Sequence, residues 1–353
     1  MKKLFWVLII VFALPTSLLA EQAFDSGGSV QSALGLIKKG QIKEAVSDLE
    51  KIIRQHPDNI EVRNMLANIY LSQNEPTKAE KHYLEVIHMN PKNAEAYNNL
   101  GLAYLQKGKV NEAMTSFRTA TQKNPKLVEA HYNLGEAALI AGYFQVAVDY
   151  FKKALQLNSK DSSIEAKLGT ALAKLGSIRE AISHFEKATK TNPDDFQSIN
   201  DLGFAYLSEN KPDKAFKQFQ KVIEAYPKST MAHYGLGLSS KALKKPDEAI
   251  VEFKKANESS SKFIDSYLES GTLLMTLGKP DEAKLDFEKA AQIYRDLFKK
   301  GASGSVGRLR FSEVLIQLGK NKEAKENLQK VLKVEKPRSA LYAQAQSLMG
   351  KIK

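Results

Sequence analysis

The sequence predicts an all-α protein, a solenoid in which one short helical unit recurs along the chain. Three observations indicate this: a period of 34 residues, large apolar residues spaced four apart within each period, and Gly or Pro at regular breaks. A length of 353 residues would otherwise indicate about two globular domains. Repetition instead predicts one elongated array, because each unit buries its apolar face against the next.

The first element along the chain has the pattern of an export signal. A cationic Met-Lys-Lys head precedes an apolar run over residues 4–14, which Pro15 interrupts, and the small residue Ala20 precedes a polar stretch. This order predicts a secretory signal peptide over residues 1–20, cleaved after Ala20, and therefore a periplasmic or secreted protein. The alternative is an uncleaved inner-membrane anchor over residues 4–20, which is at the lower length limit of a spanning helix.

The repeat itself begins after a short N-terminal segment, residues 21–25. One alanine position returns every 34 residues through eight units, and its ninth copy comes 41 residues after the eighth, so seven residues are inserted. The alanines are Ala45, Ala79, Ala113, Ala147, Ala181, Ala215, Ala249, Ala283 and Ala324, each followed four residues later by Leu, Tyr or Phe. The predicted units are 26–59, 60–93, 94–127, 128–161, 162–195, 196–229, 230–263, 264–297 and 305–338, with an insert at 298–304.

Each unit is predicted to form two helices joined by a tight turn. In the first helix, pairs such as Leu100 and Tyr104 lie four apart and share one face. A small residue beside that leucine lets a neighbouring helix approach closely. The first helices end at a position that favours a left-handed backbone, occupied by Gly40, Asn74, Gly108, Gly142, Gly176, Asn210, Gly278 and Gly319, with Lys244 as the exception.

The second helices are bounded by prolines. Pro212, for example, opens one of them, and most close before another proline. Where the closing proline is missing, at Ser159, Ser261 and Arg295, the second helix is expected to run longer. Residues 339–353 are predicted to form a final helix that covers the open end of the array.

These units resemble the tetratricopeptide repeat family, and the resemblance covers residues 26–338. It implies a right-handed superhelix of antiparallel helix pairs, with an inner wall made by the first helices. The chain is also similar to tetratricopeptide proteins of type IV pilus biogenesis, whose last repeat follows an insert comparable to residues 301–304. Those proteins are usually lipoproteins, whereas this chain has no cysteine to carry a lipid.

By that resemblance, one stripe of each first helix faces the inner wall. In residues 128–142 it runs through Tyr132, Glu136 and Ile140, and is distinct from the packing stripe with Leu134. Amides mixed with apolar side chains suit an extended peptide or a partner helix. The alternative is that these side chains merely cover the surface. The candidate groove residues are Asn64, Asn68, Asn98, Asn99, Leu102, Tyr132, Asn133, Glu136, Ile140, Asn200, Phe204 and Tyr234.

No pattern of residues predicts catalysis, a cofactor or a metal. The absence of cysteine excludes disulfides, thiolate metal sites and cysteine nucleophiles. No two of the six histidines have the spacing of a helical zinc site, and His131 and His233 occupy a position that is aromatic in other units, so a packing role is expected. Phosphate-binding loops and nucleophile motifs are also missing.

The sequence therefore predicts a non-enzymatic periplasmic scaffold that binds proteins or peptides of the cell envelope through its concave groove. Assembly of a type IV pilus, secretion or exopolysaccharide export machine is the expected context. No nucleic-acid partner is expected, and the sequence does not indicate an oligomeric state.

The alternative function rests on charge. The whole chain carries +12, of which residues 299–353 account for a net +9. This basic end would bind an anionic polymer or membrane surface, or it is only a solvated helix surface. Its candidate residues are Lys299, Lys300, Arg308, Arg310, Lys322 and Lys325.

Overall fold

The structure is a computed structural model that describes residues 27–302 and 304–352. These residues form nineteen α-helices and no strand, which confirms the all-α prediction. The predicted signal peptide lies outside the described residues. Among those described, no helix combines the length and the apolar character needed to span a bilayer.

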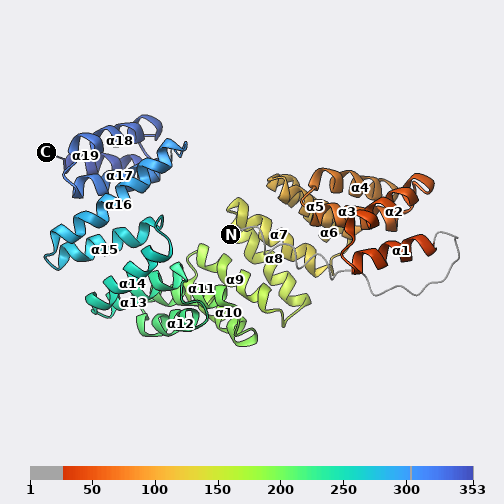
Figure 1. Cartoon of the computed structure of the whole chain (residues 1–353), viewed down its shortest axis with the longest axis horizontal. Helices are drawn as coiled ribbons and strands as arrows, with labels where there is room; N and C mark the ends of the chain where they lie inside the picture. The colour runs from red at the N-terminus through yellow and green to blue at the C-terminus, as the bar shows by residue number, and fades with distance from the viewer. Residues whose placement is uncertain (1–26, 303, 353) are drawn as a thin grey trace. The chain divides into compact units, whose positions relative to one another are not determined.

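The helices alternate along the chain as first and second helices of successive repeats (Figure 1). Their bounds are α1 (Gly27–Lys38), α2 (Ile42–Gln55), α3 (Ile60–Ser72), α4 (Pro76–Met89), α5 (Ala94–Gln106), α6 (Val110–Lys123), α7 (Val128–Ala141), α8 (Phe144–Leu157), α9 (Ser162–Lys174), α10 (Ile178–Thr191), α11 (Phe196–Ser208), α12 (Pro212–Ala225), α13 (Thr230–Ala242), α14 (Pro246–Ser259), α15 (Ile264–Thr276), α16 (Pro280–Lys299), α17 (Ser305–Gln317), α18 (Asn321–Val334) and α19 (Ala340–Gly350).

The chain divides into two compact units, which we call unit 1 and unit 2. Unit 1 ends at Thr191 and contains α1–α10, and unit 2 begins at Asn192 and contains α11–α19. Within each unit, the two helices of a repeat pack against each other, and each second helix also packs against the first helix of the next repeat.

The repeating alanine and the aromatic residue four positions after it form the core of each repeat. Every one of the nine alanines is fully buried, and so are rings such as Phe117, Phe151 and Phe253. Each phenylalanine ring of this set lies against a glycine of the first helix in its own repeat. A Cβ atom added to Gly237, for example, would lie 2.4 Å from a ring carbon of Phe253. The small residues are therefore needed to make room for a ring on the paired helix.

The turns follow the predicted pattern. All eight predicted Gly and Asn positions have a positive φ, and so does Lys244, at 59°. The first helices also gain N-terminal caps: the Asn93 side chain, for example, accepts from the backbone N–H of Ala96. Asp161 and Asp195 act in the same way on α9 and α11.

The expectation of longer second helices is right at one of its three positions. α16 continues to Lys299 and has 20 residues, as expected around Arg295. It is wrong at Ser159 and Ser261, where α8 and α14 stop after the usual 14 residues. Just after Ser159, the Asp161 carboxylate accepts from the backbone N–H groups of Ser163 and Ile164. That cap starts the next helix without a proline being needed.

The last helix, α19, lies at the end of unit 2. Ala345 and Leu348 on α19, and Ile352 after it, join the hydrophobic cluster that includes Leu315 of α17 and Val331 of α18. This contact covers the apolar face that a further repeat would otherwise bury. The insert before α17 turns at Gly301, whose φ is 92°.

Candidate functional site

The first helices of unit 1 are joined by a chain of asparagine side chains. Tyr83 Oη of α4 donates to Asn68 Oδ1 of α3 at 2.6 Å, and Asn99 Nδ2 of α5 donates to the same oxygen at 3.4 Å. Asn98 Nδ2 donates to Asn99 Oδ1 at 3.2 Å, and Asn133 Nδ2 of α7 donates to Asn98 Oδ1 at 2.9 Å. These bonds link α3, α5 and α7 into one polar row.

This row changes the expected role of the amides. Asn98 was expected to face a partner, but it is buried, because its side chain bridges Asn99 and Asn133. Asn68, Asn99 and Asn133 are half-buried. Each of these four side chains makes at least one hydrogen bond within the protein. The amides therefore hold neighbouring repeats in register, and a partner would reach only the outer edge of the row.

The rest of the predicted stripe in unit 1 combines an aromatic ring, an ion pair and an exposed aliphatic side chain. Tyr132 packs edge-on against Phe151, with ring centroids 5.7 Å apart, and burial raises the pKa of its phenol. Glu136 pairs with Lys167 Nζ of α9 at 3.1 Å. Ile140 is 60% exposed, so it is the most accessible apolar side chain of this stripe.

The corresponding face of unit 2 is aromatic. Phe204 of α11 and Tyr234 of α13 lie with ring centroids 6.4 Å apart, and neither is fully buried. Phe204 packs edge-on against Phe219, and Tyr234 packs edge-on against Phe263. These contacts fix both rings. Two half-buried rings on neighbouring first helices form an apolar surface on which a partner side chain can pack.

Polar groups border this aromatic surface. The buried Oδ1 of Asn200 has no hydrogen-bond partner among the described residues. Burial, followed by the charges of Glu269 and Asp265, raises the pKa of Tyr234, so its hydroxyl stays protonated and able to donate. Asp265 accepts from Arg310 Nη1 at 2.8 Å. Sequence reasoning missed the two acids: Glu269 lies four periods after the candidate Asn133, whereas Asp265 lies outside the predicted stripe.

The predicted basic end is less free than expected. Arg310 is paired with Asp265, which lies 45 residues earlier. Arg308 donates to Asn327 Oδ1 at 3.1 Å, and its guanidinium lies 4.8 Å from the centroid of the Phe298 ring. These two arginines therefore hold helices together. The other four candidates are lysines whose side chains have no hydrogen bond or ion pair to described residues, and three of them, Lys299, Lys300 and Lys322, are exposed whereas Lys325 is half-buried.

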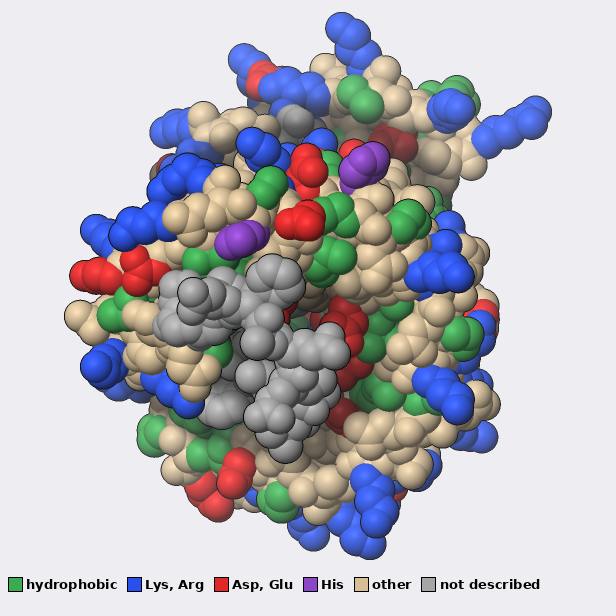
Figure 2. Space-filling model, turned by 90° about the vertical axis from the view of Figure 1, so that its right-hand side faces the viewer, with side chains coloured by type: hydrophobic (Ala, Val, Ile, Leu, Met, Phe, Trp, Pro, Cys, Tyr) green, Lys and Arg blue, Asp and Glu red, His purple; other side chains and the backbone are tan. Residues whose placement is uncertain are grey.

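Positive charge elsewhere is dispersed. On the face shown in Figure 2, Lys and Arg side chains are spread over the surface with Asp and Glu between them, so they form no single basic patch there.

The histidines at the aromatic position pack as predicted. His131 and His233 are buried, and their Nε2 atoms lie 2.9 and 3.0 Å from the carbonyl oxygens of Pro125 and Pro227. His82 stacks on Tyr70, and burial lowers its pKa. In the described part of the chain, no cluster of His, Asp and Glu is suited to hold a metal ion.

The helix pairs stack on one another, their aromatic rings pack against glycines, and one face of the first helices is accessible. These features define a helical repeat protein of the interaction-scaffold class. The chain belongs to the tetratricopeptide repeat family, since two models of that family match more than half of it, at residues 30–94, 64–128, 101–162, 264–297 and 308–337. A model described as anaphase-promoting complex, cyclosome, subunit 3 matches residues 170–256. No curated protein matches the chain.

Solved structures share this fold. A tetratricopeptide repeat protein from Parabacteroides merdae is 19% identical, with a TM-score of 0.58 over 72% of this chain and 98% of that one. Human IFIT1 is 17% identical, with a TM-score of 0.56 over 94% of this chain and 82% of that one. The APC/C hetero-tetramer Cut9–Hcn1 is 18% identical, with a TM-score of 0.52 over 75% and 52%. At identities this low, the structural similarity shows a common fold and nothing more.

Proposed function

We propose that this protein is a non-enzymatic scaffold that binds a peptide segment or helix of a protein partner on its first-helix face. The observation that carries the proposal is the pair of half-buried rings, Phe204 and Tyr234, on adjacent first helices. The rings supply an apolar anchor on which a partner side chain can pack. In unit 1, Ile140 and Tyr132 offer a smaller apolar surface.

The alternative function, binding of an anionic polymer or membrane surface by the basic end, has weaker support. Two of its six candidate residues, Arg308 and Arg310, already have partners inside the protein. The lysines that are left are separate point charges on the surface. Solvated lysines of this kind need no ligand to explain them.

We expect the double variant Phe204→Ala/Tyr234→Ala to capture its envelope partners about tenfold less than the wild type, because two anchor rings are lost. The measurement is a quantitative pull-down from solubilised cell envelope. Tyr226→Ala is the matched control, since this exposed ring lies on the C-cap of α12 and should leave capture unchanged. Equal capture by the double variant and the wild type would refute binding on this face, provided that both have the same helix content by circular dichroism.

We also propose that the protein works in the periplasm, in assembly of an envelope machine such as a type IV pilus, secretion or exopolysaccharide export system. The support is the cationic, apolar and small-residue order of residues 1–20. Mass spectrometry of the protein purified from the envelope fraction is expected to find Glu21 as its first residue. An intact Met1 would instead indicate an uncleaved anchor, and recovery from the cytoplasm would contradict export.

A further inference from the structure

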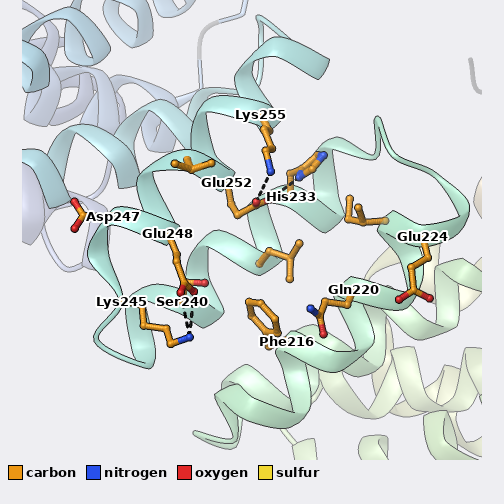
Figure 3. A pocket seen from close by; sticks show the side chains of 13 residues that line it. Phe216, Gln220, Glu224, His233, Ser240, Lys245, Asp247, Glu248, Glu252 and Lys255 are labelled. Carbon is orange, nitrogen blue, oxygen red and sulfur yellow. Dashed lines mark hydrogen bonds and ion pairs between the residues drawn. The ribbon is translucent and has the colours of Figure 1, made fainter.

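A hollow of about 750 Å³ lies between the second helices α12 and α14 of unit 2, with α13 beneath it (Figure 3). His233, Leu236 and Ser240 of α13 line it. At about 100° per residue, these three positions point about 100–160° away from Tyr234 around the axis of α13. The hollow is therefore separate from the aromatic surface of the first helices.

The hollow exists at a position where most other repeats have a large side chain. Counting by the repeat period from Ser240, the corresponding residues of the eight other repeats are Leu36, Tyr70, Tyr104, Ala138, Leu172, Tyr206, Leu274 and Leu315. Ser240 is fully buried, and its Oγ atom has no hydrogen-bond partner. A small side chain with an unpaired hydroxyl thus stands where three other repeats place a tyrosine.

Tyr70 shows what a ring in this position contacts. Its ring stacks on His82, with centroids 5.7 Å apart, and Lys78 Nζ lies 4.9 Å from its centroid. Its hydroxyl donates to Glu50 Oε1 on the preceding second helix at 2.7 Å. The ring is 5% exposed, so it fills the space between α2 and α4.

The same contact positions surround the hollow. Five periods after Glu50, Lys78 and His82 come Gln220, Glu248 and Glu252, and all three line the hollow. In Figure 3, Glu248 lies near Ser240 and Lys245 at one end of the hollow, and Glu252 lies near His233 at the other. The positions that surround the Tyr70 ring thus line the hollow in this repeat, although with different residues, and no ring stands between them.

The charges of the hollow differ from those around Tyr70. Lys78 and His82 are both replaced by acids, and the lining has four carboxylates, Glu224, Asp247, Glu248 and Glu252, against two lysines. Lys245 pairs with Glu248 at 3.1 Å, and Lys255 pairs with Glu252 at 2.7 Å. An acidic lining in a chain of net charge +12 favours a ligand with positive charge beside its ring.

We propose that this hollow receives an aromatic side chain, best a tyrosine, from a protein partner that has Lys or Arg next to it. Phe216, Ile223 and Val251 would pack on the ring. Gln220 would bond its hydroxyl, and the acids would attract the neighbouring cation. Unit 2 thereby gains a second protein-binding surface, on different residues from the one in the proposed function.

The test uses a variant whose own side chain occupies the hollow. Ser240→Tyr places the ring of the other repeats in this position, with its hydroxyl directed to Gln220, whereas Ser240→Ala keeps the space and is the matched control. The probes are three blocked pentapeptides with the sequences Gly-Lys-Tyr-Lys-Gly, Gly-Lys-Ala-Lys-Gly and Gly-Glu-Tyr-Glu-Gly. Their affinity for the full-length protein is measured by NMR titration.

The wild type is expected to bind the Lys-Tyr-Lys peptide about tenfold more tightly than the other two. Ser240→Tyr should lose about tenfold in affinity for that peptide and melt at a higher temperature, because its own ring replaces the ligand. Ser240→Ala and Phe204→Ala/Tyr234→Ala should bind as the wild type does. Unchanged binding by Ser240→Tyr, or equal binding of all three peptides by the wild type, overturns the proposal. If Ser240→Tyr does not fold, Ser240→Leu takes its place, since four other repeats have leucine there.

Discussion

Truncating Phe151 to alanine is expected to lower the free energy of unfolding by about 3–5 kcal/mol, the cost of emptying a well-packed aromatic site. The ring is fully buried between α7 and α8, where it lies against the backbone at Gly135 and the edge of Tyr132. The helix backbones on both sides are held by hydrogen bonds within each helix, so they cannot close the space. Urea denaturation followed by circular dichroism measures the change.

Leu157→Ala is the control for Phe151→Ala. Leu157 is at the end of the same helix but is 41% exposed, so its removal should cost no more than about 1 kcal/mol. A similar loss in the two variants would contradict the packing of Phe151, because a buried ring and a half-exposed leucine would then contribute equally.

Replacing Gly237 by alanine is expected to destabilise the protein, although alanine is the better helix former by about 1 kcal/mol. The added Cβ would lie 2.4 Å from a ring carbon of Phe253, well inside contact distance. Overpacking of a filled core costs about 1–3 kcal/mol, which outweighs the gain in helix propensity. The ring cannot move aside, because Phe253 is itself fully buried. Urea denaturation gives the net effect.

Gly35→Ala is the matched control for Gly237→Ala. Gly35 lies within α1, and a Cβ added there has no atom within 4 Å, so this substitution should stabilise the helix by about 1 kcal/mol. In a Phe253→Leu background, Gly237→Ala should cost less than in the wild type, because the clashing ring edge is gone. Stabilisation by Gly237→Ala in the wild-type chain would show that the glycine is not required by the ring.

The elements of this fold follow from local signals repeated at one spacing. A helix end depends on a few neighbouring residues, so Gly142, Asn74 and even Lys244 could be placed in left-handed turns from the period alone. Other helix ends depend on a cap that the missing proline does not reveal. At Ser159 the missing proline suggested a longer helix, whereas the carboxylate of Asp161 starts the next helix at its usual place.

The candidate site was only partly predictable. The period correctly placed Phe204 and Tyr234 on adjacent first helices, where their rings approach each other. It could not show that Asn98 is buried by its bonds to Asn99 and Asn133. Those bonds depend on side-chain orientations that are set when three first helices pack, and the spacing of residues in one helix does not contain them.

The sequence by itself determined the all-α class, the period, the helix ends and the alternation of first and second helices, because each depends on contacts within about one repeat. The tertiary structure alone decided which polar groups are free. Arg310 has Asp265 as its partner from 45 residues away, and Ser240 lines a hollow rather than a filled core. Charge and size can be read from a residue, but its partners depend on which side chains the packed helices bring within reach.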